Sequence, residues 1–120
     1  MPLYLERFRA YHLGLNLSKV IIDVARSFPR GHGDLRDQID RAATSIVANI
    51  AEGAGRASVK DKRHFYAVAR GSLMECIALL QRSRNEFLIE ERNLMTMKAK
   101  ADILAKMLSR LISPSSSKSS

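Results

Sequence analysis

Between residues 91 and 112, apolar side chains recur at alternating intervals of three and four residues. The positions are Leu94, Met97, Ala101, Leu104, Leu108 and Leu111. This spacing places them on one side of an α-helix and is typical of the seam between packed helices. No strand-like alternation of apolar and polar residues appears anywhere in the chain. The segment needs other helices to cover it, which predicts an all-α fold.

Clusters of glycine and proline divide the rest of the chain into three more helical segments. Pro29 and the glycines at 31 and 33 form one break, and the run from Gly53 to Gly55 forms another. Asp34 is expected to cap the second helix, and Ser58 the third. The predicted helices span 5–28, 34–53, 58–87 and 91–112. Their short connections favour one antiparallel up-down-up-down four-helix bundle over residues 1–112, followed by a disordered Ser-rich tail over 113–120.

Each segment has an apolar face that we expect to line the core. In the first segment, one stripe is Leu13, Leu17, Val20, Val24 and Phe28, and a second is Phe8, Leu15 and Ile22. The second segment has Leu35, Ile39, Ala42, Ala43, Ile46 and Ile50. The third has Phe65, Ala69, Leu73, Cys76, Leu80 and Phe87. A wide apolar surface on the first helix indicates contact with more than one neighbour.

Composition and motifs exclude several functional classes. No apolar run approaches the roughly 20 residues of a transmembrane helix, and the N-terminus lacks a signal-peptide pattern. Cys76 is the single cysteine, which suits a reducing cytoplasm. The histidines His12, His32 and His64 lie in separate segments, and no metal, phosphate-loop or nucleophile motif occurs. We therefore expect a cytoplasmic, non-enzymatic protein with no catalytic, cofactor-binding or metal-binding residues.

Polar residues at helical spacing lie beside the apolar faces of the second and third helices. The stripe on the second helix is Arg41, Ser45, Asn49, Glu52 and Arg56, and the third helix has Gly71, Ser72 and Glu75. One interpretation is a solvated face with weak intrahelical ion pairs. The other is a polar network, within the bundle or between subunits, formed by Arg41, Asn49, Glu52, Gly71, Ser72 and Glu75.

The net charge of +8 becomes more informative when it is placed on the predicted bundle. The start of the first helix, the connection between the second and third, and the end of the fourth must share one end. We call this the basic end, because it collects nine basic residues against three acidic ones, an excess of six. The opposite end has a net charge of −1. Excess positive charge of this kind suits nucleic-acid phosphates, although it can also serve solubility alone.

The candidate phosphate-binding residues at the basic end come from the connection between the second and third helices and from the end of the fourth helix. They are Arg56, Lys60, Lys62, Arg63, Lys106 and Arg110. Aromatic residues are scarce there apart from Tyr4 and Phe8, so neither base stacking nor sequence readout is expected.

Two stretches carry a family resemblance. The run from Arg41 to Gly53, which reads RAATSIVANIAEG, resembles a signature of the four-helix-bundle proteins encoded in 23S rRNA intervening sequences. The pattern of an aromatic, Ala69 and Gly71-Ser72 followed by Glu75 is similar to a second signature of that family. The resemblance covers roughly residues 8–111. One departure is the Arg30–Gly33 segment, where family members often carry an acidic or aromatic residue.

The resemblance implies a left-handed bundle that assembles as a homopentamer. It also implies kinship with accessory proteins of diversity-generating retroelements, which bind reverse transcriptase and nucleic acid. The leading hypothesis is therefore an oligomeric, RNA-associated bundle without enzymatic activity. The alternative is a protein-interaction adaptor that docks a partner such as a reverse transcriptase, and an orphan enzyme is the third possibility.

Overall fold

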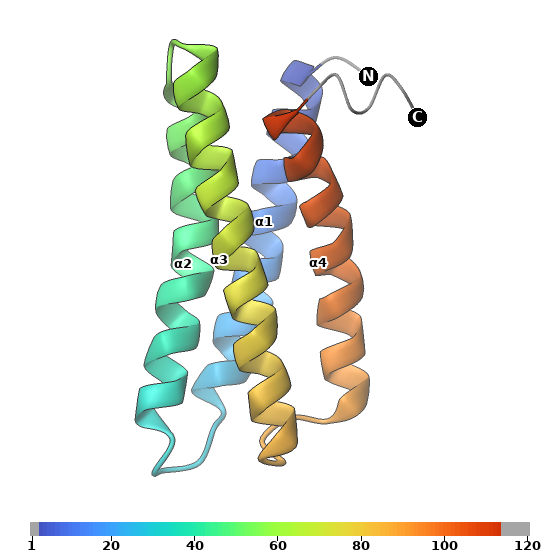
Figure 1. The fold of residues 1–120 in the computed structure, drawn as a ribbon. Helices are drawn as coiled ribbons and strands as arrows, with labels where there is room; N and C mark the ends of the chain where they lie inside the picture. Colours follow the sequence, from blue (N-terminus) through green and yellow to red (C-terminus); the bar gives the residue numbers. More distant parts are fainter. Residues whose placement is uncertain (1–2, 114–120) are drawn as a thin grey trace.

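The computed structural model describes residues 3–113 and forms one four-helix bundle. The helices are α1 (Leu3–Arg26), α2 (Gly33–Gly55), α3 (Val59–Asn85) and α4 (Glu91–Ile112). Neighbouring helices run in opposite directions, and α4 packs back against α1 to close the bundle (Figure 1). Figure 1 also places the start of α1, the α2–α3 turn and the end of α4 at the same end. The all-α four-helix bundle predicted from the sequence is confirmed.

The helix ends differ from the expected ones by up to two residues. α1 stops at Arg26, and the N–H of Phe28 then donates to the Ala25 carbonyl at 3.1 Å. Phe28 is buried although it follows the helix. α2 extends to Gly55, α3 ends at Asn85, and α4 has the expected limits. Of the expected disordered tail over 113–120, only Ser113 lies within the described residues.

The two expected helix caps have different outcomes. The hydroxyl of Ser58 accepts a hydrogen bond from the N–H of Asp61 at 3.1 Å, so the N-cap of α3 is confirmed. Asp34 as the N-cap of α2 is wrong, because His32 occupies that position and makes no side-chain cap bond. Asp34 instead lies in the first turn, where its negative charge favours the helix dipole.

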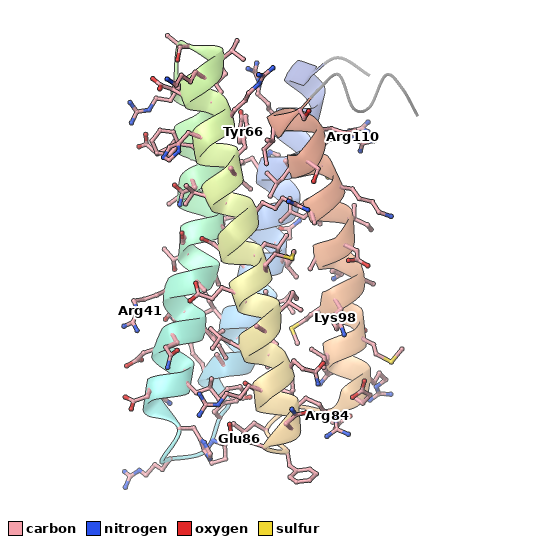
Figure 2. The ribbon with its side chains drawn as sticks, viewed as in Figure 1. Arg41, Tyr66, Arg84, Glu86, Lys98 and Arg110 are labelled. Atoms are coloured by element: carbon pink, nitrogen blue, oxygen red, sulfur yellow. The ribbon has the colours of Figure 1, made fainter. Side chains whose placement is uncertain are left out.

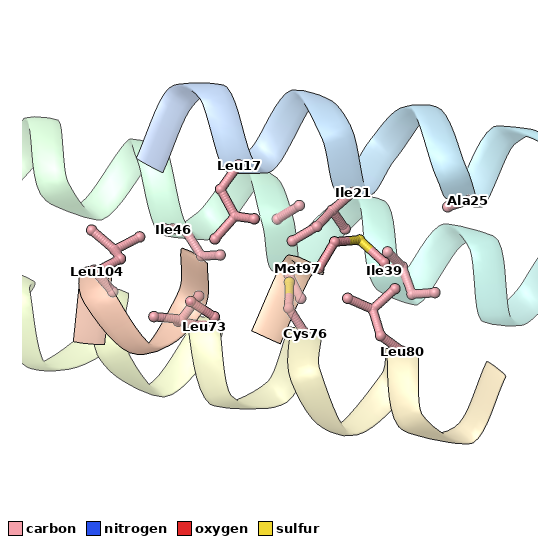
Figure 3. Packing of buried hydrophobic residues seen from close by; sticks show 14 of the residues in the cluster. Leu17, Ile21, Ala25, Ile39, Ile46, Leu73, Cys76, Leu80, Met97 and Leu104 are labelled. Carbon is pink, nitrogen blue, oxygen red and sulfur yellow. The ribbon is translucent and has the colours of Figure 1, made fainter. Parts of the chain in front are cut away.

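The core contains the predicted apolar faces of α2 and α4 in full. All six expected residues of each helix are buried. Figure 3 shows how Ile39 and Ile46 of α2 pack with Leu104 and Met97 of α4 and with Leu73 of α3. The alternation of three and four residues therefore marks the true seam of the bundle on α4.

The expected core face of α1 is wrong in part. The residues that line the core are Ala10, Gly14, Leu17, Ile21, Ala25 and Phe28. Of the predicted stripes, Leu17 and Phe28 are buried, Leu13, Ile22 and Val24 pack partly buried against the core, and Phe8, Leu15 and Val20 are exposed. The small residues allow a close approach, since a Cβ at Gly14 would lie 3.0 Å from Cδ1 of Ile50. A search for large apolar side chains therefore misses part of the core face of α1, where small residues are buried.

On α3, the expected face is wrong at both ends. Tyr66 is buried in place of its neighbour Phe65, which is half-buried. Phe87 lies beyond the helix and is 86% exposed, whereas Ser83 completes the buried stripe. The buried series runs from Tyr66 through Ala69, Leu73, Cys76 and Leu80 to Ser83, with steps that alternate three and four.

Candidate nucleic-acid interface

The antiparallel arrangement brings the basic residues of three segments to one end of the bundle. Among residues 7–113, whose side chains the structure describes, this end has eight basic side chains and two acidic ones, Glu52 and Asp61. The basic members are Arg7, Arg9, Arg56, Lys60, Lys62, Arg63, Lys106 and Arg110. The candidates on the α2–α3 turn thus share an end with Lys106 and Arg110 of α4, and the individual side chains differ in what they contact.

Lys62 binds the backbone of the preceding helix. Its Nζ donates to the carbonyl oxygens of Gly53 at 3.3 Å and of Ala54 at 3.1 Å. These carbonyls lie in the last turn of α2, where a positive charge and a donor are both favourable. Lys62 therefore caps α2 from α3, and part of its hydrogen-bonding capacity is used within the fold.

Arg56 lies between an acidic residue and an aromatic ring. Its Nη2 pairs with Oε2 of Glu52 at 3.0 Å, and its guanidinium carbon lies 4.6 Å from the centroid of the Phe65 ring. The ring of His64 in turn meets Phe65 edge-on at 5.1 Å. The basic end thus contains more aromatic surface than the sequence predicted, because Phe65 faces Arg56 instead of the core.

Three other candidates extend into solvent. Lys60, Arg63 and Lys106 are exposed, and none makes a hydrogen bond or an ion pair with any described residue. Arg110 is also exposed, and Figure 2 shows it extending from α4 on the side away from α3. The exposed basic candidates therefore lie on two sides of the basic end.

The polar residues of α2 and α3 separate into a bonded group and an open group. The hydroxyls of Ser45 and Ser72 are 2.7 Å apart, and Nδ2 of Asn49 donates to the Ser45 carbonyl at 2.8 Å and to its hydroxyl at 3.0 Å. This part-buried chain links α2 to α3. It brings together only Asn49 and Ser72 of the six predicted network residues, and it includes Ser45 from the same stripe.

The other predicted network residues lie outside that chain. Arg41 and Glu75 line an open hollow of about 380 Å³ together with Gln38, Ala42 and Ser45. Glu52 pairs with Arg56 at the basic end. At Gly71 an added Cβ would meet no atom within 4 Å, so no described part of the chain packs on this glycine. Figure 2 shows Arg41 directed away from the bundle.

Among residues 3–113, no group of three or more metal-ligating side chains is present. Cys76 is fully buried, and burial, with a smaller contribution from the charge of Glu75, raises its pKa to about 12. Its thiol is therefore neutral and shielded at physiological pH. No helix in the described part combines the length and apolar character that spanning a membrane requires.

Comparisons with known proteins agree on the fold. A crystal structure of a protein of unknown function from the S23 ribosomal protein family of Bacteroides thetaiotaomicron superimposes with a TM-score of 0.82 and 19% sequence identity. The match covers 89% of this chain and 97% of that one. No curated protein matches the chain. The model of the family described as "23S rRNA-intervening sequence protein" matches residues 6–110, which is most of the chain. The chain therefore belongs to the 23S rRNA-intervening sequence protein family.

Proposed function

We propose that this protein is a non-enzymatic bundle that associates with RNA in the cytoplasm and binds nucleic-acid phosphates through its basic end. The observation that carries the proposal is the segregation of charge along the bundle. The described basic end has an excess of six positive charges, whereas the opposite end has six basic and seven acidic side chains. Neutralisation of phosphates by clustered Lys and Arg provides most of the affinity of sequence-independent binding.

The proposed contacts fall into two classes. Lys60, Arg63 and Lys106 supply mobile charges to phosphate oxygens, and Arg110 extends the same surface on α4. Arg56 differs from them because Glu52 and the Phe65 ring hold its guanidinium in place. A pre-positioned guanidinium can bind a phosphate with less loss of side-chain entropy than a free lysine.

The test compares two triple variants of equal net charge. Lys60, Arg63 and Lys106 are replaced by Ala in the first, and Arg70, Lys98 and Lys100 in the second, which are exposed and lie away from the basic end. Lys62 is left intact in both because it caps α2. Binding to a labelled RNA hairpin is measured by fluorescence anisotropy over a series of salt concentrations.

We expect the first variant to bind more weakly and with a flatter salt dependence. The log–log slope should decrease by about 0.7–0.9 for each phosphate that the variant no longer neutralises. The second variant should resemble the parent protein. Equal weakening in both variants would mean that binding depends on the net charge of the protein and not on the basic end. Unchanged binding by the first variant would contradict the proposal.

A parallel homo-oligomeric ring would strengthen this interaction. The family resemblance to pentamers supports such an assembly, since five basic ends on one face would form one continuous patch. Light scattering at micromolar concentration tests this part separately. A monomeric mass would contradict the oligomer, and RNA would then bind to the basic end of a single bundle.

A second candidate function is an adaptor for a protein partner, and the outer face of α4 favours it. Met95 and Ile103 are 62% and 56% exposed there, with the exposed Ala99 between them. An apolar ridge of this kind fits the groove of a partner protein. Binding of a reverse transcriptase that survives nuclease treatment, and that is abolished when Met95 and Ile103 are both replaced by Lys, would favour this candidate.

A further inference from the structure

The most exposed large apolar side chain of the described chain belongs to a residue with a strained backbone. Phe87 is 86% exposed and has a φ of 61°, in the left-handed region. It follows Glu86, the C-cap residue of α3. There the N–H of Leu88 donates to the Ser83 carbonyl at 2.9 Å, and the N–H of Phe87 to the Arg84 carbonyl at 3.0 Å. This is the helix-ending position that glycine normally occupies.

The fold does not require an aromatic ring at this position. Ile89, which is 8% exposed, and the half-buried Leu88 cover this end of the core, whereas the Phe87 ring remains in water. Ion pairs on either side fix the connection, between Arg82 and Glu86 and between Arg84 and Glu91, both at 3.0 Å. A strained, exposed aromatic residue held by a well-anchored loop is an unfavourable arrangement unless the ring binds something.

Near the other end, an apolar hollow of about 430 Å³ lies between α1 and α2. We call it the α1–α2 hollow; its lining residues are Arg7, Phe8, Tyr11, Ala51 and Ala54. Phe8 is 59% exposed, so the hollow offers aromatic surface to an incoming ring.

Charge determines which ends of two copies can approach each other. Two basic ends would repel each other, because each has an excess of six positive charges. The Phe87 end has a net charge of −1, so its approach to a basic end avoids this repulsion. The hollow lies beside the first turns of α1 and the last turns of α2, so an offset head-to-tail approach can bring Phe87 of one copy to the hollow of the other. We infer that Phe87 of one molecule docks into the α1–α2 hollow of a second copy of this chain. Such a contact is heterologous, so its repetition gives chains or a closed ring.

The first experiment measures self-association of the purified protein by analytical ultracentrifugation over a range of concentrations, without nucleic acid. Phe87→Gly removes the ring and relieves the positive φ. It should therefore raise the midpoint of thermal unfolding by a few degrees while weakening self-association roughly ten- to hundredfold. Any lateral assembly is present in parent and variant alike and cancels in the comparison.

The second experiment blocks the receiving surface. Ala51 is exposed and lines the hollow, so Ala51→Lys should fill it without disturbing the core, and Ala48→Lys is the matched control outside the hollow. Phe87→Gly and Ala51→Lys proteins should each lose head-to-tail association when alone. Mixed together they should form a heterodimer, because one retains the hollow and the other retains the ring.

Three results would overturn the inference. They are the same association constant in the parent and in Phe87→Gly, equal effects of Ala51→Lys and Ala48→Lys, and no heterodimer in the mixture. Loss of association together with a lower thermal midpoint in Phe87→Gly would also count against it, since the ring would then have a structural role. None of these variants changes Lys60, Arg63 or Lys106, so the outcome is independent of RNA binding.

Discussion

The ring of Tyr66 occupies the space where a side chain at Gly53 would lie. A Cβ at Gly53 would be 2.6 Å from Cε1 and 2.8 Å from Cδ1 of that ring. Tyr66 is 1% exposed and therefore has little room to move away. The glycine that ends the RAATSIVANIAEG run thus has a structural explanation: α2 and α3 can pack this closely only without a side chain at position 53.

Gly53→Ala should destabilise the protein by about 1–3 kcal/mol, because overpacking a buried ring outweighs the better helix propensity of alanine. Gly71→Ala is the matched control in α3, where an added Cβ meets nothing within 4 Å. It should stabilise the protein by roughly 0.5–1 kcal/mol. Urea unfolding followed by circular dichroism measures both, and a stabilising Gly53→Ala would refute the close contact.

The hydrogen bond between Ser45 and Ser72 should couple α2 to α3 energetically. Ser72→Ala is expected to cost about 1 kcal/mol, and Ser45→Ala more, because Ser45 also accepts from Asn49. In a double-mutant cycle, the two substitutions should show a coupling energy of about 1 kcal/mol. Strict additivity would mean that the two hydroxyls do not interact in solution.

Lys62 should contribute to stability more than Lys60, although both lie in the first turn of α3. Lys62→Met keeps the aliphatic stem but removes the two bonds to α2 carbonyls, at an expected cost of about 1 kcal/mol. Lys60→Met should be nearly neutral, because Lys60 makes no hydrogen bond or ion pair with a described residue. Thermal unfolding distinguishes them, and equal midpoints would show that the cap is not formed.

Stability should decrease at alkaline pH because of Cys76. Burial raises its pKa from 9.0 to about 12 in the folded protein. The thiol is neutral in both states below pH 9, so its contribution is fully present there. Between pH 9 and about 12 the unfolded chain loses the proton first, and the free energy of unfolding falls by up to about 1.4 kcal/mol per pH unit.

Tyr66 adds to this alkaline loss at higher pH. Burial raises its pKa above 10.0, against a smaller opposing effect of Arg7, so its contribution begins to disappear above pH 10. Unfolding measured from pH 8 upward should show a smaller slope in Cys76→Ala, whereas Tyr66→Phe should change the slope only above pH 10. An unchanged slope in Cys76→Ala would contradict burial of the thiol.

The sequence patterns predicted the bundle well where large side chains form the seam. In α4 the series from Leu94 to Leu111 is uninterrupted, and every member is buried. In α1 the same approach succeeded only in part: it found Leu17 but missed Ala10, Gly14 and Ala25, which line the core and have little hydrophobicity to reveal it. Their small size is itself the determinant, since it allows close contact with the neighbouring helices.

In α3 the spacing of residues does mark the buried face. Strict alternation of three and four residues selects Tyr66 and Ser83, whereas a preference for apolar residues selected Phe65 and Phe87. At the candidate interface, topology alone placed the basic residues at one end. That Lys62 caps α2 and that Arg56 lies on Phe65 follow from backbone and rotamer geometry, which spacing in the sequence cannot provide.

The short α2–α3 turn has a consequence for the order in which the chain folds. Only three residues, Arg56–Ser58, separate the two helices, and Ser58 and Lys62 anchor the turn from both sides. Pairing α2 with α3 therefore closes a very small loop, whereas pairing α1 with α4 joins the two extremes of the described chain. We expect the α2–α3 hairpin to form in the folding transition state and the α1–α4 contact to follow it.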